Sequence, residues 1–361
     1  MTPVTADAPR VRRSLLRALI SVTAVTATAL ATVATTHADE LGTPYPPEEP
    51  VPTTPVPPNP PVGGTTFNIS SFNVLGSTHT QSGRRARMGS GIYRIGLAAK
   101  FLDKHQLDVV GFQELQMDQW TRFTEVAGDR YGTFPGGLSR RMVQNSIAWN
   151  LAEWTLVEGH FVKIPYFDGI EWDMPVVRLQ NLQTGQHVYF ANFHNPATNR
   201  KHRNSTPHRR EAERRQVALA NALYATGLPV FFTGDMNERE KYFCTMAAGT
   251  QMKAANGGRY NSTVGCVPPP KPMPVNWIMG SKKRGQFSNY VRDDSKLVNR
   301  ITDHFVVRAT VTMRGAFVSP EDAPVWPPPV VEPPVDPDYP GDPGTEEQPD
   351  GIGYSVVTRR G

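Results

Sequence analysis

The sequence predicts a mixed α/β or α+β fold for residues 66–315, between two proline-rich segments. Apolar stretches typical of strands alternate with helical segments along this whole region, and no repeat period is present. A region of this length is sufficient for one large domain with its own core. We therefore expect a single mixed domain and exclude a coiled coil or a stack of small repeats.

Five short stretches are expected to be strands because they are rich in β-branched and aromatic residues and are bounded by turn residues. They are residues 67–75, 108–114, 188–194, 229–237 and 303–313. In four of them polar residues of unusual chemistry stand at the C-terminal end, whereas in the last they stand at the start. If these residues share one site, the last strand runs opposite to its neighbours and the sheet is mixed.

Two segments between the strands are expected to be helical. Residues 92–105 place apolar side chains on one face of a helix, and residues 207–226 start with a proline and stop at Gly227. The second helix is rich in arginine, and we expect these side chains to face solvent or substrate. They are Arg209, Arg210, Arg214 and Arg215.

The terminal segments predict export. Residues 1–38 have the basic, apolar and small-residue regions of a signal peptide, and Arg12-Arg13 also fits a twin-arginine signal, so both export routes stay open. Residues 39–65 are predicted to be a stiff proline-rich linker, and residues 316–361 an acidic, proline-rich, disordered tail. We expect a secreted or cell-surface protein.

Charge and cysteine content point to an anionic partner and one disulfide. Residues 66–315 contain 32 basic and 19 acidic residues, a net charge of +13, which favours nucleic acid or phospholipid. The two cysteines, Cys244 and Cys266, form an even count in a chain predicted to be exported, which indicates one bridge. A metal site built on these two cysteines would need further Cys or His nearby.

The strand ends together hold the side chains that phosphodiester hydrolysis needs. A lone Glu114 would often only cap a strand, and Asp235 with Asn237 would often only form a turn. Together with His194 and His304, these residues could catalyse one reaction. Carboxylates suit a hard divalent cation, and imidazoles can accept a proton from water and supply one to a leaving oxygen.

These residues in this order resemble the endonuclease/exonuclease/phosphatase superfamily, also called the deoxyribonuclease I-like fold. The resemblance covers residues 66–313 and includes Asn73, Gln113-Glu114, His194, Gly234-Asp235-Met236-Asn237 and Asp303-His304. It implies a four-layer sandwich of two packed mixed β-sheets flanked by helices. It also implies metal-dependent phosphoester cleavage with Mg²⁺ or Mn²⁺, while additional Ca²⁺ stays open, and we expect a monomer.

The resemblance also implies roles for single residues. Glu114 matches the principal metal ligand, with Asn73 and Asp303 as further ligands. The catalytic set it implies is His194, Asp235, Asn237, Asp303 and His304. In this set the first histidine donates to the leaving group or binds phosphate, the Asp and Asn of the fourth motif orient water and phosphate, and the last histidine is the general base.

Asn276 departs from the family pattern. An aspartate usually stands there and supports the second histidine, His304 in this chain. An asparagine accepts a hydrogen bond from imidazole but does not stabilise imidazolium as a carboxylate does. We therefore expect a supporting contact from Asn276 without a nearby negative charge, with Asp294 as the alternative support.

The leading hypothesis is an exported nonspecific nuclease acting on DNA or RNA, with cleavage inside or at the end of the strand undecided. Its predicted phosphate-binding residues are Arg84, Arg85, Arg200, Lys201 and Arg203. A basic face that only keeps the protein soluble is the plain alternative. Two other functions stay open: a phospholipid phosphodiesterase similar to bacterial sphingomyelinases, with the aromatic loop 165–172 entering the membrane, and a noncatalytic surface-binding module.

Overall fold

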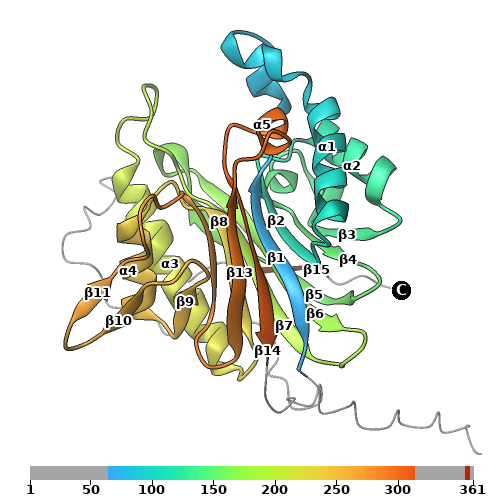
Figure 1. The fold of residues 1–361 in the computed structure, drawn as a ribbon. Coiled ribbons are helices and arrows are strands. Elements are labelled where there is room, and N and C mark those ends of the chain that lie inside the picture. The colour runs from blue at the N-terminus through green and yellow to red at the C-terminus, as the bar shows by residue number, and fades with distance from the viewer. Residues whose placement is uncertain (1–63, 314–353, 358–361) are drawn as a thin grey trace, which may run out of the picture. The chain divides into compact units, whose positions relative to one another are not determined.

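The computed structural model describes residues 64–313 and 354–357. The predicted signal peptide, nearly all of the linker and most of the acidic tail therefore lie outside the described residues. Two β-sheets pack against each other, and helices cover the outer side of each (Figure 1). The predicted four-layer sandwich is confirmed.

The first sheet has six strands in the order β13-β14-β1-β2-β4-β3. Its strands are β1 (Thr66–Asn73), β2 (Val109–Gln113), β3 (Tyr131–Phe134), β4 (Ile147–Asn150), β13 (Gly285–Asp293) and β14 (Val306–Met313). Strand β1 is parallel to β2 and antiparallel to β14. The last long strand thus runs opposite to β1, as the position of its polar residues predicted.

The second sheet has seven strands in the order β15-β5-β6-β7-β8-β12-β9. Its strands are β5 (Trp154–Pro165), β6 (Glu171–Asn181), β7 (His187–His194), β8 (Val230–Asp235), β9 (Met252–Ala254), β12 (Asn276–Ser281) and β15 (Tyr354–Val357). Strands β7 and β8 are parallel, and β12 is antiparallel to β8. This arrangement brings the end of β7, the end of β8 and the start of β12 to one edge of the sheet.

Helices α1 (Gly91–Lys104) and α2 (Met117–Ala127) pack on the first sheet, as does the short α5 (Val298–Ile301). Helices α3 (Thr206–Ala225) and α4 (Glu240–Gly249) pack on the second. Both helices expected from the sequence are confirmed within one residue at each end. Short 3₁₀ turns fill the connections: η1 (Ser77–Thr80), η2 (Arg84–Met88), η3 (Gly136–Leu138), η4 (Met142–Asn145) and η5 (Phe167–Gly169).

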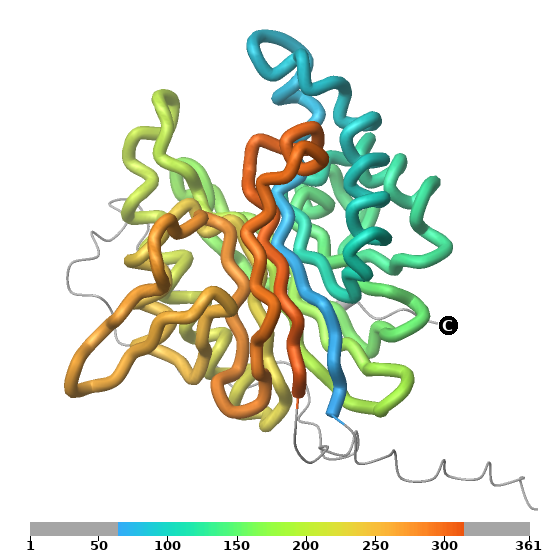
Figure 2. Tube along the Cα trace, viewed as in Figure 1, coloured from blue at the N-terminus to red at the C-terminus, as the bar shows by residue number. Residues whose placement is uncertain are grey.

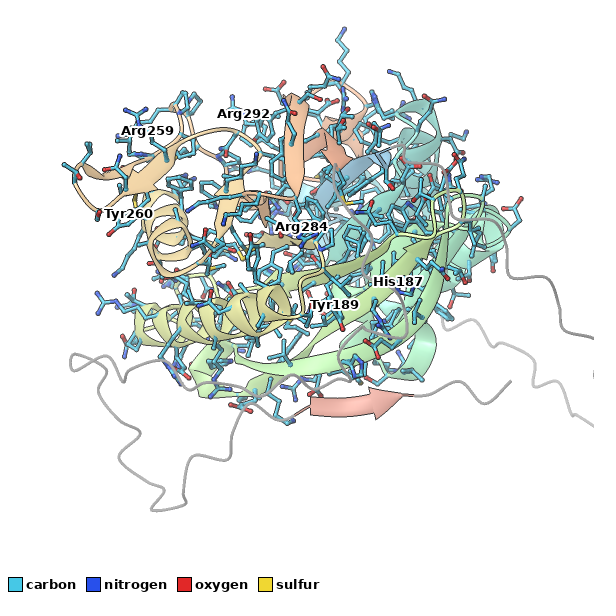
Figure 3. All side chains as sticks on the ribbon, turned by 90° about the horizontal axis from the view of Figure 1, so that it is seen from below. His187, Tyr189, Arg259, Tyr260, Arg284 and Arg292 are labelled. Atoms are coloured by element: carbon cyan, nitrogen blue, oxygen red, sulfur yellow. A yellow bond between two sulfur atoms is a disulfide. The ribbon has the colours of Figure 1, made fainter. Side chains whose placement is uncertain are left out.

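A small hairpin of β10 (Arg259–Asn261) and β11 (Gly265–Val267) follows α4 and β9. The predicted disulfide is confirmed: Cys244 of α4 is bonded to Cys266 of β11. Arg259 and Tyr260 lie on this hairpin, away from the strand that carries His187 and Tyr189 (Figure 3). The bridge thus attaches an exposed hairpin to the helical layer.

The interface between the sheets changes from apolar to polar toward the edge where β7 and β8 end. Its core is apolar and includes Phe67 and Phe231, one from each sheet, whose rings meet edge to face. Closer to that edge, Gln113 Nε2 donates to Asn192 Oδ1 at 2.7 Å, and the backbone N–H of Gly234 donates to Ser71 Oγ at 3.1 Å. These buried hydrogen bonds fix the position of one sheet on the other.

Gly111 allows this close approach. A Cβ at this position of β2 would lie 1.9 Å from Thr233 Oγ1 and 2.4 Å from Asn192 Oδ1. Both neighbours belong to the second sheet, and both already take part in the buried hydrogen bonds. A larger residue would therefore have to push the sheets apart or break the polar network.

We expect Gly111→Ala to lower the free energy of unfolding by about 1–3 kcal/mol, the usual cost of overpacking a well-packed interior. The matched control is Gly96→Ala in α1, where the added Cβ has no neighbour within 4 Å apart from the adjacent residues and the helix's own backbone. That change should raise stability by about 0.5–1 kcal/mol, because alanine favours a helix over glycine. Urea unfolding of both variants measures the difference, and equal stabilities would contradict the proposed sheet contact.

Candidate active site

A buried carboxylate, Asp235 at the end of β8, brings the predicted catalytic residues together. Its Oδ2 lies 3.3 Å from Nδ1 of His304 and 3.9 Å from Nε2 of His194, and it accepts a hydrogen bond from Asn73 Nδ2 at 3.1 Å. Its Oδ1 accepts the backbone N–H of Asn237 at 3.1 Å. Because Asn73 comes from the first sheet and Asp235 from the second, the site spans the interface between them.

Strand register places three of these residues side by side. His194 on β7 is directly opposite Asp235 on β8, and Asp235 is directly opposite Asn276 on β12. Asn276 is buried and its Oδ1 lies 3.2 Å from His304 Nδ1. The row is therefore set by backbone pairing, and its side chains do not depend on flexible loops for their position.

The predicted supporting contact of Asn276 is thus present, but the expectation of a missing charge is wrong. The carboxylate of Asp235 lies as close to His304 Nδ1 as the amide does, so His304 faces one neutral and one charged acceptor. Asp294, the alternative support, is an exposed residue whose backbone carbonyl accepts a hydrogen bond from Asn299.

Glu114 follows β2 and adopts a left-handed backbone conformation with φ of 59°. Its Oε1 accepts from Asn73 Nδ2 at 2.9 Å, and its Oε2 accepts from the backbone N–H of Gly76 at 3.0 Å and lies 3.3 Å from His79 Nε2. Burial alone would raise the pKa of Glu114, but the nearby His194, these two hydrogen bonds and His79 together lower it below its usual value. Glu114 is therefore ionised at neutral pH.

Asp303 is held at the rim of the site by Arg85. The guanidinium Nη2 of Arg85, on η2, lies 2.5 Å from Asp303 Oδ2. Arg84 lies on the same turn and is exposed. One predicted phosphate-binding residue thus contacts a predicted catalytic residue directly, and the other points its charge toward solvent.

A second basic segment lies between β7 and α3. Arg200, Lys201 and Arg203 are all exposed on it. This loop and the η1–η2 segment project at the same end of the molecule, in yellow-green and cyan in Figure 2. The two segments that carry the basic residues therefore lie on both sides of the strand ends that carry the site.

The expectation that the arginines of α3 face solvent or substrate is wrong for three of the four. Arg209 is buried and donates to Pro196 O and Thr198 Oγ1 at 3.0 and 2.8 Å, which ties down the basic loop. Two others, Arg214 and Arg215, form ion pairs with Glu211. Arg210 is the exposed member of the set.

The aromatic loop at residues 165–172 packs into the protein. Tyr166 is buried and its ring contacts those of Phe167 and Trp172 at centroid distances of 4.4 and 4.5 Å, while Phe167 stacks on His202. Of the large apolar side chains in this loop, Ile170 alone is exposed. The loop therefore does not present the aromatic surface expected of a membrane-inserting segment.

Three further residues at the site have no signal in the sequence. His79 contacts Glu114, and Tyr166 contacts His194. The third residue, Arg94, is a fully buried cation. Its guanidinium donates to the carbonyls of Val74 and Leu75, both at 2.6 Å, and of Ile301 at 2.8 Å. Arg94 thus fixes the loop after Asn73 against the segment that precedes Asp303. A helical arginine gives no sequence indication of such a role.

The donor chemistry of the site suits a hard divalent cation. Glu114 is kept ionised, and Asp303 is a second carboxylate, at the rim of the site. Asn73 turns its amide nitrogen toward Glu114, while its Oδ1 accepts the backbone N–H of Leu75 at 3.0 Å. Within residues 64–313 no three His, Cys, Asp or Glu side chains form a ready metal cage. Mg²⁺ needs no such cage, because one or two carboxylates with water and substrate phosphate complete its coordination.

Comparison with known proteins agrees with the fold. A model of the endonuclease/exonuclease/phosphatase family matches residues 65–327, whereas no curated protein matches the sequence. A protein of this family from Bacteroides thetaiotaomicron shares 16% identity and a TM-score of 0.52, over 70% of this chain and 99% of that one. A family protein from Bacteroides vulgatus shares 14% identity and a TM-score of 0.54, over 69% of this chain and 100% of that one. The human Nocturnin catalytic domain with bound sulfate shares 15% identity and a TM-score of 0.50, over 70% of this chain and 95% of that one.

The fold and the clustered acidic, histidine and amide side chains define a phosphoesterase. The chain belongs to the endonuclease/exonuclease/phosphatase family, whose model covers most of its length.

The contact between Asn276 and His304 predicts a pH effect. Asn276→Asp adds a second carboxylate at His304 Nδ1, and an adjacent negative charge stabilises the protonated imidazole. The acidic limb of the kcat–pH profile should therefore move to higher pH, while the plateau rate holds or increases. The new carboxylate also lies opposite Asp235, so a lower free energy of unfolding is expected.

The control for this experiment is Asp294→Asn, which should leave the acidic limb in place. An unchanged limb in Asn276→Asp would show that the residue does not act on His304. A limb that moves only in Asp294→Asn would assign the support to Asp294.

Proposed function

We propose that the protein is an exported, metal-dependent phosphodiesterase that hydrolyses DNA or RNA with little sequence preference. The observation that supports it most is the buried Asp235 carboxylate, which lies beside both histidines at an edge flanked by basic loops. Export is inferred from the sequence of residues 1–38. No helix among the described residues is long and apolar enough to cross a membrane.

The arrangement suits in-line attack by water on phosphorus. His304 takes a proton from the water as its oxygen bonds to phosphorus, and Asp235 with Asn276 holds the imidazole and stabilises the charge it gains. The bond to the leaving oxygen breaks, and His194 stands on the other side of Asp235 to donate a hydrogen bond there or to a phosphate oxygen. Asn237 is tied to Asp235 through its backbone N–H, and its side-chain amide donates to Asn195 O at 2.8 Å.

Glu114 and Asp303 would hold the divalent cation, and Asn73 would keep Glu114 in place through its amide N–H. When bound, it would offset the negative charge that grows on the phosphate during the reaction. The backbone N–H of Gly76 and the side chain of His79 stabilise the ionised form of Glu114. These contacts keep the carboxylate available as a ligand at neutral pH.

Two features favour nucleic acid over a phospholipid. Exposed basic side chains on two loops suit a polymer with many phosphates, because each neutralised phosphate adds to binding. The aromatic side chains at residues 166–172 pack on one another and on His202, so they are not free to enter a membrane. A noncatalytic module would not explain why the whole row of acid–base residues is in contact.

The metal ligand assignment predicts a large loss of activity in Glu114→Gln. The change keeps the size of the side chain but removes its charge, so nicking of supercoiled plasmid in Mg²⁺ or Mn²⁺ should fall by at least ~10²-fold. Glu125→Gln on α2 is the matched control, since Glu125 is an exposed residue paired with Arg122, and it should keep full activity.

A chelator should abolish nicking by the unmodified protein. The same preparations are tested for release of phosphocholine from sphingomyelin. Phosphocholine release without nicking would favour the phospholipid alternative, and neither activity in any metal at pH 6–9 would favour a noncatalytic module.

The basic loop predicts salt-dependent binding. Each of Arg200, Lys201 and Arg203 that contacts a phosphate should contribute about one unit to the slope of log Kd against log salt. We expect their joint replacement by Ala, in the Glu114→Gln background, to lower that slope for a fluorescent oligonucleotide. The charge-matched control replaces Arg259, Lys283 and Arg284. Arg259 lies on the hairpin, and Lys283 and Arg284 lie on the turn after β12. Figure 3 labels Arg259 and Arg284. An equal change in both triple variants would mean that only total charge matters.

A further inference from the structure

The two histidines of the site have different partners at Nδ1. His304 Nδ1 faces the carboxylate of Asp235 and the amide of Asn276. His194 Nδ1 instead lies 3.4 Å from the hydroxyl of Tyr166, whose ring meets the imidazole edge to face at a centroid distance of 5.4 Å. One histidine is thus supported partly by a charge, and the other by a phenol.

Tyr166 is held firmly in this position. It directly follows β5, and the turn after it closes through the hydrogen bond from its backbone N–H to Ile170 O at 2.9 Å. Its ring packs against those of Phe167 and Trp172, and 8% of the residue is exposed. The turn is also tied to the basic loop, because Asp168 Oδ2 lies 2.9 Å from His202 Nδ1.

The phenol of Tyr166 stays protonated. Burial raises its pKa far above the usual value of 10, and the negative charges of Glu114 and Asp235 raise it further. A protonated phenol both donates and accepts hydrogen bonds. It can therefore serve either charge state of the neighbouring imidazole, whereas a carboxylate would favour the protonated one.

We propose that Tyr166 is a positioning residue that keeps a proton on Nε2 of His194, directed into the site. When His194 is neutral, the Tyr166 hydroxyl donates to Nδ1, so the ring proton sits on Nε2. When His194 is protonated, Nδ1–H donates to the phenol oxygen and Nε2 again carries a proton. Nε2 lies 3.9 Å from Asp235 Oδ2, beyond hydrogen-bond distance, so its N–H is not committed to that carboxylate.

The proposal rests on the proposed function, because the N–H of Nε2 is given to a phosphate or leaving-group oxygen. It assigns the two imidazoles opposite tasks. His304, beside a carboxylate, is suited to take up a proton, and His194, beside a phenol, is suited to present one. The phenol hydroxyl accounts for this difference. Tyr166→Phe removes the hydroxyl and keeps the aromatic packing.

The first test is nitrogen NMR of the resting protein and needs no substrate. In the unmodified protein the neutral His194 ring should carry its proton on Nε2, and in Tyr166→Phe the ring should become a mixture of tautomers. Tyr131→Phe is the control, since Tyr131 is also buried and its hydroxyl donates to Leu107 O, away from the site. An unchanged His194 tautomer in Tyr166→Phe would overturn the proposal, whatever substrate the enzyme has.

The second test is kinetic. Tyr166→Phe should lower kcat/KM for plasmid nicking by about 10-fold, the rate equivalent of one lost hydrogen bond, whereas Tyr131→Phe should not. In the His194→Ala background the Tyr166→Phe change should cost nothing more, because the group it positions is gone. Additive losses would show that Tyr166 acts independently of His194 and would also overturn the proposal.

If the unmodified protein does not cleave nucleic acid, the proposed function fails but the tautomer measurement still decides the role of Tyr166. Melting temperatures of both tyrosine variants check that they are folded.

Discussion

The burial of one carboxylate, Asp235, is the constraint on which the site depends. An ionised group that is fully buried is costly unless hydrogen bonds and opposite charge surround it. Here the partners are Asn73, the backbone of Asn237 and the imidazole of His304, and they come from both sheets. Stabilising the carboxylate and assembling the site are therefore the same event, because neither sheet alone supplies all these partners.

This arrangement requires the sheets to be held in one relative position. Gly111 lets the strands approach, and the buried hydrogen bonds among Gln113, Asn192 and Ser71 fix their offset. On the outer side, Arg94 ties the loop after β1 to the residues before Asp303 through backbone carbonyls. The polar groups below the site thus exclude other sheet offsets, which a purely apolar interface would tolerate more easily.

The sequence was sufficient for five of the strands, the two longest helices and the disulfide, because each of these has a local pattern. The sequence also identified His194, Asp235 and His304, because polar residues at the ends of apolar stretches can be recognised without a structure. The side chains that contact these residues were harder to predict. Tyr166 and His194 are 28 positions apart, and only the path of the turn after β5 brings them together.

Two misjudged features show the same limit. Helical spacing predicted an accessible Arg209, but the loop before α3 folds back and uses its guanidinium as a hydrogen-bond donor. Asn276 was expected to leave the general base without a charge, because the local motif does not reveal that Asp235 lies across the ladder from it. In both cases the deciding contact is made by a segment distant in sequence.

The partners of the two histidines explain why one buried carboxylate is sufficient for the site. A second carboxylate at His194 would lie near Glu114 and Asp235, and it would add like charge to a region that already holds several acids. The phenol of Tyr166 holds the ring without adding charge. Keeping the charge low leaves Glu114 ionised by its own few contacts, so that carboxylate stays available for a divalent cation while the histidines keep their orientation.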